Sequence, residues 1–309
     1  MGVEPLRALV AAELSQPVDL RVAALGPIIA ARHPGARALL FYGSCLRETR
    51  LDGLMLDFYL IVGDYRQAFG RRWLALANRL LPPNVFPFEA HGLVAKYAVL
   101  SEADFARLCS AATDNVSVWA RFAQPARLVW AASDAAAERA VEAVAGAAPA
   151  LLSAARPCLP DEADALDLWR GAFALTYRAE LRAERRTRAA SVVDADPDRY
   201  RRFTAPALAA ASLEARQAGE RVRFVQPLAP AARRTGARAW ARRRRQGKAL
   251  TLLRLAKASA TYAGGLDYLA WKIGRHAGEP IAIRPWQRRW PVLGALSLLP
   301  RLLARGAVR

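Results

Sequence analysis

The chain has 309 residues, of which 54% are hydrophobic and 24% charged, and its 46 Lys and Arg against 27 Asp and Glu give a net charge of +19. This length suggests one large or two ordinary domains, and the composition excludes a globally disordered protein. The mean hydropathy of +0.05 and the lack of any apolar run near the roughly 18 residues that span a bilayer exclude a polytopic membrane protein.

The positive charge is concentrated toward the C-terminal end. Residues 231–309 hold fifteen Arg and three Lys against Asp267 and Glu279, a net charge of +16, which leaves +3 for the first 230 residues. Such a field implies an anionic partner, either a nucleic-acid backbone or anionic lipid headgroups. The three cysteines form no CxxC pair, and Glu4 and Glu13 interrupt the start of the chain. We therefore expect a reducing, cytosol-facing location and no signal peptide.

The first hundred residues predict alternating helices and strands. In chain order, the expected elements are a helix at 19–32, strands at 38–42 and 54–62, an amphipathic helix at 66–80, a short edge strand at 86–88, a strand at 93–100 and a helix capped by Ser101.

The chain changes character twice, near residues 110 and 230. Beyond residue 102 the strand pattern nearly vanishes, and helices are expected at 134–155, 163–188 and 200–218. The basic run at 233–248 is either a solvated arm or one face of a helix. We therefore divide the chain into three parts, 1–110, 111–230 and 231–309.

Two features of the predicted strands point to chemistry. Gly43 and Ser44 follow the first strand, and a Gly-Ser turn offers backbone N–H groups and a hydroxyl to a triphosphate. Asp57 interrupts the apolar second strand, where an acid is costly unless it is paired or binds a metal. Each feature alone also fits a plain turn and a structural ion pair. Together, in this order, they favour metal-assisted nucleotidyl transfer.

Lys96 is a third candidate. It lies in the predicted strand 93–100, which is otherwise apolar, and it is one of four lysines in the chain. Its ammonium group either reaches solvent along the edge of the strand or points into a phosphate site. The residue pattern leaves both interpretations open.

Six short motifs, in order, resemble a known family. They are FYGS at 41–44, MLDF at 55–58, AKYAVLS at 95–101, WARFAQP at 119–125, TYRAELR at 176–182 and IAIRPWQRRWPVLGA at 281–295. This series is similar to that of the mitochondrial translocator-assembly-and-maintenance phosphatidate cytidylyltransferases. Those enzymes make CDP-diacylglycerol and pyrophosphate from CTP and phosphatidic acid.

The resemblance implies an α+β fold in three parts. Residues 1–110 would form a nucleotidyltransferase domain of the polymerase-beta type, and 111–230 a mostly helical, winged-helix-like domain. Residues 231–309 would form a basic membrane-associating region ending in an amphipathic helix. The implied partners are CTP, phosphatidic acid or a related lipid phosphate, and an anionic membrane surface. The expected location is cytoplasmic, bound peripherally to the inner face of a membrane.

The resemblance also implies roles for individual residues. It makes Asp57, Lys96 and Glu180 catalytic and places Gly43, Ser44, Lys96 and Arg182 on the CTP phosphates. The expected cofactor is Mg²⁺, held by Asp57 and a second acid. We take Asp52 as that acid, with Glu89 and Glu180 left open as alternatives, because Met55 stands where general nucleotidyltransferases carry the first acid of an Asp-x-Asp pair.

The C-terminal sequence predicts membrane association independently of the resemblance. An apolar stretch from Trp290 to Leu303, framed by arginines and interrupted by Pro291 and Pro300, is too short to span a bilayer and suits the headgroup plane. His276 could contact a lipid headgroup, act as a general base or cap a helix.

Two other functions stay open: a nucleotidyltransferase that acts on RNA or a small molecule, with the basic tail as an RNA clamp, and an inactive scaffold. A nucleic-acid partner is the less favoured of these expectations because no RNA-recognition motif accompanies the basic run.

Overall fold

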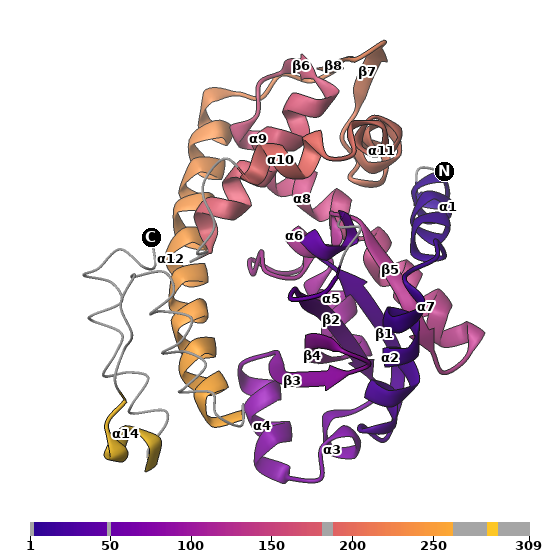
Figure 1. Cartoon of the computed structure of the whole chain (residues 1–309). Coiled ribbons are helices and arrows are strands. Elements are labelled where there is room, and N and C mark those ends of the chain that lie inside the picture. Colours follow the sequence, from indigo (N-terminus) through magenta and orange to yellow (C-terminus); the bar gives the residue numbers. More distant parts are fainter. Residues whose placement is uncertain (1–2, 48–50, 181–187, 262–282, 290–309) are drawn as a thin grey trace.

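The computed structural model of the chain describes residues 3–47, 51–180, 188–261 and 283–289. It is an α+β fold with a five-stranded mixed sheet, a small three-stranded sheet and helices around both (Figure 1). The segments 281–295 and 290–303 that entered the sequence analysis, with His276 and Arg182, lie wholly or mostly outside the described residues.

The larger sheet has the strand order β3-β4-β2-β1-β5. Its strands β2 and β4 run parallel, whereas the other neighbouring pairs are antiparallel. The bounds are β1 (Ala36–Tyr42), β2 (Met55–Val62), β3 (Asn84–Ala90), β4 (Leu93–Ser101) and β5 (Ala126–Ala131). The strands expected at 38–42, 54–62, 86–88 and 93–100 are confirmed, and β3 tolerates Pro87 because it is an edge strand.

The two faces of this sheet pack against different helices because side chains alternate along each strand. On one face, Phe58 and Leu60 of β2 pack in a core with Leu25 and Ile29 of α2 (Leu20–Ala31), the helix expected at 19–32. On the other face, Tyr59 and Ile61 join a second core with several helices. These are α1 (Val3–Leu14), α5 (Glu102–Leu108), α6 (Trp119–Phe122), α7 (Asp134–Ala145) and α8 (Ala147–Ala155).

The second half of the chain adds helices and a small antiparallel sheet. The elements are a 3-10 turn η2 (Arg156–Cys158), β6 (Glu162–Asp164), α9 (Ala165–Ala179), α10 (Arg188–Asp194), α11 (Pro197–Ala210), β7 (Ala215–Ala218) and β8 (Arg221–Phe224). The indole N–H of Trp169 donates to the Tyr200 carbonyl oxygen at 3.1 Å and the Thr204 hydroxyl at 2.9 Å. These bonds fix α9 against α11 within the core.

Two expectations about elements were wrong. The predicted lack of strands after residue 102 misses β5, which completes the larger sheet, and the hairpin β7–β8, whose polar strands turn at Gly219. The helix expected at 66–80 is two helices, α3 (Tyr65–Ala68) and α4 (Arg72–Leu80). It breaks because Phe69 is extended where its ring enters the core. Ser101 does cap α5, accepting from the Asp104 N–H at 3.2 Å.

The basic run forms part of a long helix rather than a solvated arm. Helix α12 (Pro230–Thr261) contacts η2, α9 and β3, and so runs from the helical part of the chain to the edge of the larger sheet (Figure 1). The indole N–H of Trp240 donates to the Ala154 carbonyl oxygen at 2.8 Å. Gly247 packs directly on the Ala179 carbonyl oxygen, where a side chain would collide with it. A short helix, α14 (Pro285–Arg289), follows. None of the helices described is both long enough and apolar enough to cross a bilayer.

Candidate active site

The predicted acid and lysine lie in one row across the larger sheet. Tyr42 on β1, Asp57 on β2 and Lys96 on β4 are partners in register, and Pro87 on β3 continues the row. All four side chains share the sheet face of Tyr59, because they alternate with residues that pack against α2. The row is therefore turned toward the helical half of the chain.

Asp57 and Lys96 form an ion pair with 3.1 Å between Oδ1 and Nζ. Their side chains are 27% and 33% exposed. A pair this accessible can exchange one partner for a ligand at a smaller desolvation cost than a fully buried pair. The arrangement suits a site in which Asp57 binds a cation and Lys96 binds an anionic group.

The Gly-Ser turn faces the same carboxylate. Gly43 directly follows β1 with φ of +99°, and a Cβ built there would lie 3.6 Å from Asp57 Oδ2. Ser44 begins the 3-10 turn η1 (Ser44–Arg47). Glycine is suited to this backbone and leaves the space above the carboxylate open. The structure thus brings Gly43, Asp57 and Lys96 together, as the order of motifs suggested, with Ser44 next to them in the chain.

A substitution at Gly43 separates backbone strain from occupation of this space. Gly43→Ala and Gly53→Ala both place a side chain on a left-handed backbone, since Gly53 has φ of +75°, and only the first adds a methyl group beside Asp57. We expect both variants to lose about 1 kcal/mol or more of unfolding free energy. Only Gly43→Ala should also weaken nucleotide binding, measured by calorimetry. Equal binding by the two variants would contradict a role for the turn.

A partly buried ion pair borders the row. Arg121 of α6 donates to Glu180 Oε1 at 3.2 Å and to the Ser117 hydroxyl at 3.2 Å. Glu180 is the C-cap of α9, and its side chain is 7% exposed. Burial raises the pKa of the Tyr42 hydroxyl well above its ordinary value, the charge of Asp57 raises it further, and Arg121 acts in the opposite sense. Tyr42 is therefore a neutral hydroxyl between Asp57 and Arg121.

Helix α12 contributes two more cations. Arg254 donates to the Pro82 carbonyl oxygen at 2.8 Å and to the Ser117 hydroxyl at 3.1 Å. Lys257 donates to the carbonyl oxygens of Leu81 and, at 2.8 Å, Pro83. The pKa of Tyr59, two residues along β2 from Asp57, is raised by burial and responds to the charges of Arg121, Arg254 and Glu180. Arg254 therefore lies near Tyr59, on the sheet face that carries the row.

Lys257 makes the stability of the fold depend on pH. Burial, and then the charge of Arg254, lower its pKa from 10.5 to about 7. The unfolded chain keeps this proton up to its ordinary pKa and the folded chain does not, so the folded state gains stability as pH rises from about 7 to 10.5. We expect Lys257→Met to remove this gain, measured by urea unfolding at several pH values in that interval. Lys248→Met, at an exposed position of the same helix, should keep it. The same pH profile in both variants would refute the assignment.

Asp52, a further predicted site residue, lies apart from the row. Asp52 pairs with Arg21 of α2 at 2.9 Å, and α2 packs on the opposite face of the sheet. Its assignment as the second metal ligand stays a prediction, and so does a catalytic role for Glu180, whose described partner is Arg121. Glu89 is exposed on the edge strand β3. Arg182 lies outside the described residues.

The donor chemistry at Asp57 fits Mg²⁺. Magnesium takes oxygen ligands and is commonly held by one or two carboxylates together with substrate phosphates. Asp57 offers a partly exposed carboxylate beside the open turn at Gly43. Among the residues that the structure describes, no cluster of three or more His, Cys, Asp or Glu side chains is placed to hold an ion. A metal ion at this row would be held by the Asp57 carboxylate.

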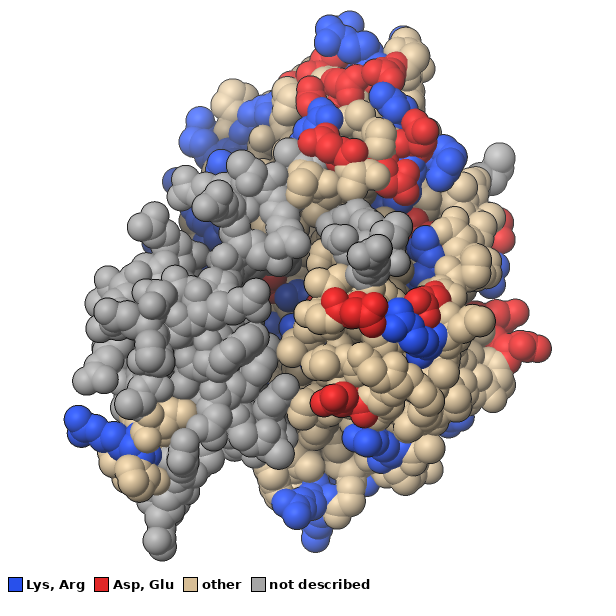
Figure 2. All heavy atoms as spheres, in the orientation of Figure 1, with Lys and Arg blue, Asp and Glu red and all other residues tan. Residues whose placement is uncertain are grey.

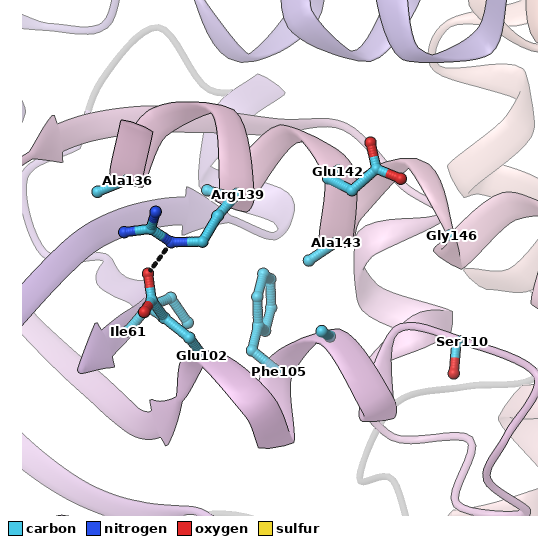
Figure 3. Close-up of a pocket in the computed structure, with 11 residues that line it drawn as sticks. Ile61, Glu102, Phe105, Ser110, Ala136, Arg139, Glu142, Ala143 and Gly146 are labelled. Atoms are coloured by element: carbon cyan, nitrogen blue, oxygen red, sulfur yellow. Dashed lines mark hydrogen bonds and ion pairs between the residues drawn. The ribbon is translucent and has the colours of Figure 1, made fainter. Parts of the chain in front are cut away.

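A separate pocket of about 380 Å³ lies between α5 and α7, with Ile61 of β2 in its lining. Figure 3 shows Phe105 projecting from α5 toward α7. The ion pair between Arg139 Nε and Glu102 Oε1, at 2.7 Å, lies at one side of the pocket. Asp57 and Lys96 are not among its lining residues. The pocket is therefore distinct from the site built on the row.

Sequence reasoning missed the cations that border the row. Arg121 lies within the motif at 119–125, but neither its spacing nor its neighbours indicate that it would meet Glu180, 59 positions away. Arg254 belongs to the basic region, where single residues do not stand out. Neither a scan against protein-family models nor a search of curated proteins gave a match, so the residues and their geometry carry the functional argument.

Proposed function

We propose that the chain is a Mg²⁺-dependent cytidylyltransferase that makes CDP-diacylglycerol and pyrophosphate from CTP and phosphatidic acid at a membrane surface. One observation carries the proposal: the Asp57 carboxylate faces the positive-φ turn at Gly43 and meets Lys96 at 3.1 Å. A carboxylate, an open glycine turn and an ammonium group are the parts that a site for a triphosphate and its metal ion needs.

The proposed fold assignment follows the same elements. The order of α2, β1, the Gly-Ser turn and the acid-bearing β2 agrees with a nucleotidyltransferase domain of the polymerase-beta type. Helices α9–α11 with the hairpin β7–β8 agree with a winged-helix-like domain. These are proposals about finer classification within the α+β fold.

In the proposed reaction, a phosphate oxygen of the lipid attacks the α-phosphorus of CTP in line. The bond from that phosphorus to the oxygen bridging to the β-phosphate breaks, and pyrophosphate leaves with the electron pair. Magnesium, when bound, would neutralise charge on the triphosphate. Asp57 would hold that ion, the turn at Gly43 and Ser44 would cradle the phosphates, and Lys96 would exchange its contact with Asp57 for a phosphate oxygen.

The partly buried charges around the row support an anionic substrate. Three of the five ionic side chains described there are cations, Lys96, Arg121 and Arg254, and two are carboxylates, Asp57 and Glu180. Because partly buried charges are weakly screened, this excess of positive charge favours phosphate groups over neutral acceptors. Arg121 is held by Glu180 and would act as a fixed charge rather than as a proton donor.

The lipid acceptor is proposed from the basic α12 and the family resemblance. Arg234, Arg238, Arg242, Arg245 and Lys248 are exposed on α12 at helical spacing, opposite the buried Trp240. Each basic residue near an anionic leaflet contributes about 1 kcal/mol to membrane binding. We accordingly propose a peripheral protein on the cytoplasmic face of a membrane.

The test is to incubate the purified chain with Mg²⁺, phosphatidic acid and each of the four ribonucleoside triphosphates in turn, and to follow pyrophosphate release. Release with CTP that requires phosphatidic acid is the expected result. Absence of release with every nucleotide and lipid phosphate would refute the proposal.

RNA is the alternative acceptor, because the exposed basic face of α12 also suits a nucleic-acid backbone. Vesicle flotation and RNA gel-shift assays on the same preparation separate the two. Binding to RNA without binding to anionic vesicles would favour a nucleotidyltransferase that acts on RNA.

A further inference from the structure

Helix α4 presents its apolar side chains to solvent. Trp73, Leu76 and Leu80 recur at the three- and four-residue spacing that places them on one face, and they are 46%, 58% and 74% exposed. On amphipathic helices of globular proteins such a face normally packs on the core. In α4, Leu74 and Ala75 face the core, whereas Trp73, Leu76 and Leu80 do not.

The side of α4 that faces the core carries Ala75 and Asn78, which are buried, and Leu74, which packs against the core. The Asn78 side chain is 0% exposed, donates to the Val99 carbonyl oxygen at 2.9 Å and accepts from the Asn84 N–H. Asn84 returns a bond from its side-chain amide to the Leu74 carbonyl oxygen at 3.0 Å. These bonds tie α4 to β3 and β4 and fix its orientation, so the exposed apolar face is built into the fold.

The charges around this face are basic. Arg71, Arg72 and Arg79 of the same segment are exposed, and no acidic residue occurs between Asp64 and Glu89. At the lower edge of the face shown in Figure 2, below the position of α4 in Figure 1, the visible charged side chains are basic. A tryptophan and leucines flanked by arginines have the chemistry of a helix that lies at a membrane interface.

The basic helix α12 adjoins this face. Lys257 of α12 donates to the carbonyl oxygen of Leu81, the residue directly after α4. Leu253, one turn earlier, is 53% exposed. Helix α12 is therefore bound to the segment that directly follows α4.

We infer that α4 is a docking helix that inserts Trp73, Leu76 and Leu80 into the interfacial region of an anionic bilayer. The proposed function supplies the choice of a lipid occupant, and the inference rests on it in that respect. Docking through α4, which is tied by hydrogen bonds to β3 and β4, would hold the larger sheet at the membrane surface where a lipid phosphate lies.

The test uses flotation on vesicles of phosphatidylcholine, with and without phosphatidic acid. The variant Trp73→Ser/Leu76→Ser/Leu80→Ser should bind the anionic vesicles about tenfold or more weakly than wild type. The control Leu20→Ser/Val225→Ser removes apolar side chains that are 86% and 46% exposed elsewhere, and should bind like wild type. Equal binding by wild type and the triple variant would overturn the inference. So would a change in oligomeric state, measured by light scattering, that left vesicle binding unchanged.

A second measurement does not depend on the triple substitution. Leu76→Cys in a Cys158→Ser background, labelled with an environment-sensitive dye, should shift its emission to the blue on anionic vesicles, since Cys45 and Cys109 are buried. An unshifted dye would contradict insertion.

With a short-chain phosphatidic acid that stays monomeric in water, the triple variant should release pyrophosphate at the wild-type rate. Failure of wild type in that assay would refute the proposed reaction and leave the docking result to be judged by flotation.

Discussion

Replacing Asp57 by Asn is expected to lower pyrophosphate release from CTP by about a thousandfold or more. The carboxamide keeps the shape of the side chain but loses the negative charge that would hold Mg²⁺, and it leaves the Lys96 ammonium without its partner at 3.1 Å. The charge stabilisation that a metal ion supplies in phosphoryl transfer amounts to several kcal/mol, and each 1.4 kcal/mol is roughly tenfold in rate. The measurement is the initial rate with phosphatidic acid as acceptor.

The same substitution at Asp198 is the matched control. Asp198 is 77% exposed and pairs with Arg201 on the surface of α11, away from the row. Asp198→Asn should keep the wild-type rate. Thermal unfolding of Asp57→Asn close to that of wild type would show that the loss is one of chemistry and not of folding. A rate within tenfold of wild type for a folded Asp57→Asn protein would remove Asp57 from the mechanism.

Replacing Glu13 by Gln is expected to cost about 3 to 5 kcal/mol of unfolding free energy. Glu13 of α1 accepts from Arg199 Nη2 at 3.1 Å and from its Nε, and Arg199 also donates to the Ala123 carbonyl oxygen at 3.1 Å. The two side chains are 9% and 3% exposed. Without the carboxylate, the guanidinium stays charged in a buried position between α1 and α11. We expect the melting temperature to fall on the order of 10 °C.

Glu4→Gln is the control for this substitution on the same helix. Glu4 is 77% exposed and pairs with Arg7 at 3.5 Å, so its loss should change the unfolding free energy by about 0.5 kcal/mol or less. The double variant Glu13→Met/Arg199→Met should recover part of the lost stability, because it leaves no unpaired charge. A Glu13→Gln protein as stable as Glu4→Gln would show that the buried pair contributes little.

The sequence was sufficient for the elements whose burial follows a simple pattern. The apolar runs that became β1, β2 and β4 were predicted within a few residues, since strands buried on both faces are continuously apolar. The hairpin β7–β8 could not be found this way, because its strands ARQA and RVRF are short and polar. At 66–80 the pattern was correct for helical structure but did not reveal the break at Phe69 or the hydrogen bonds of Asn78 that help to orient α4.

In the site, the local sequence was sufficient to predict the residues of the row. It was insufficient to predict the cations that border them. Gly43 and Asp57 are close in the chain, and adjacent strands bring them together. The contact of Arg121 with Glu180 depends on how α6 packs against the end of α9, and the position of Arg254 depends on the course of α12. Such long-range placements follow from the packing of whole elements, which spacing within a motif does not encode.

The most direct test of the proposed function measures transfer of the α-phosphorus of CTP to the lipid. Wild-type protein and Asp57→Asn are incubated with Mg²⁺, vesicles containing phosphatidic acid, and CTP labelled at its α-phosphorus, and the products are extracted into chloroform. If the proposed reaction is correct, label enters the organic phase with wild type only when phosphatidic acid is present. With Asp57→Asn, label stays in the aqueous phase. Label that stays in the aqueous phase with wild type, or that enters the lipid equally with both proteins, would contradict it.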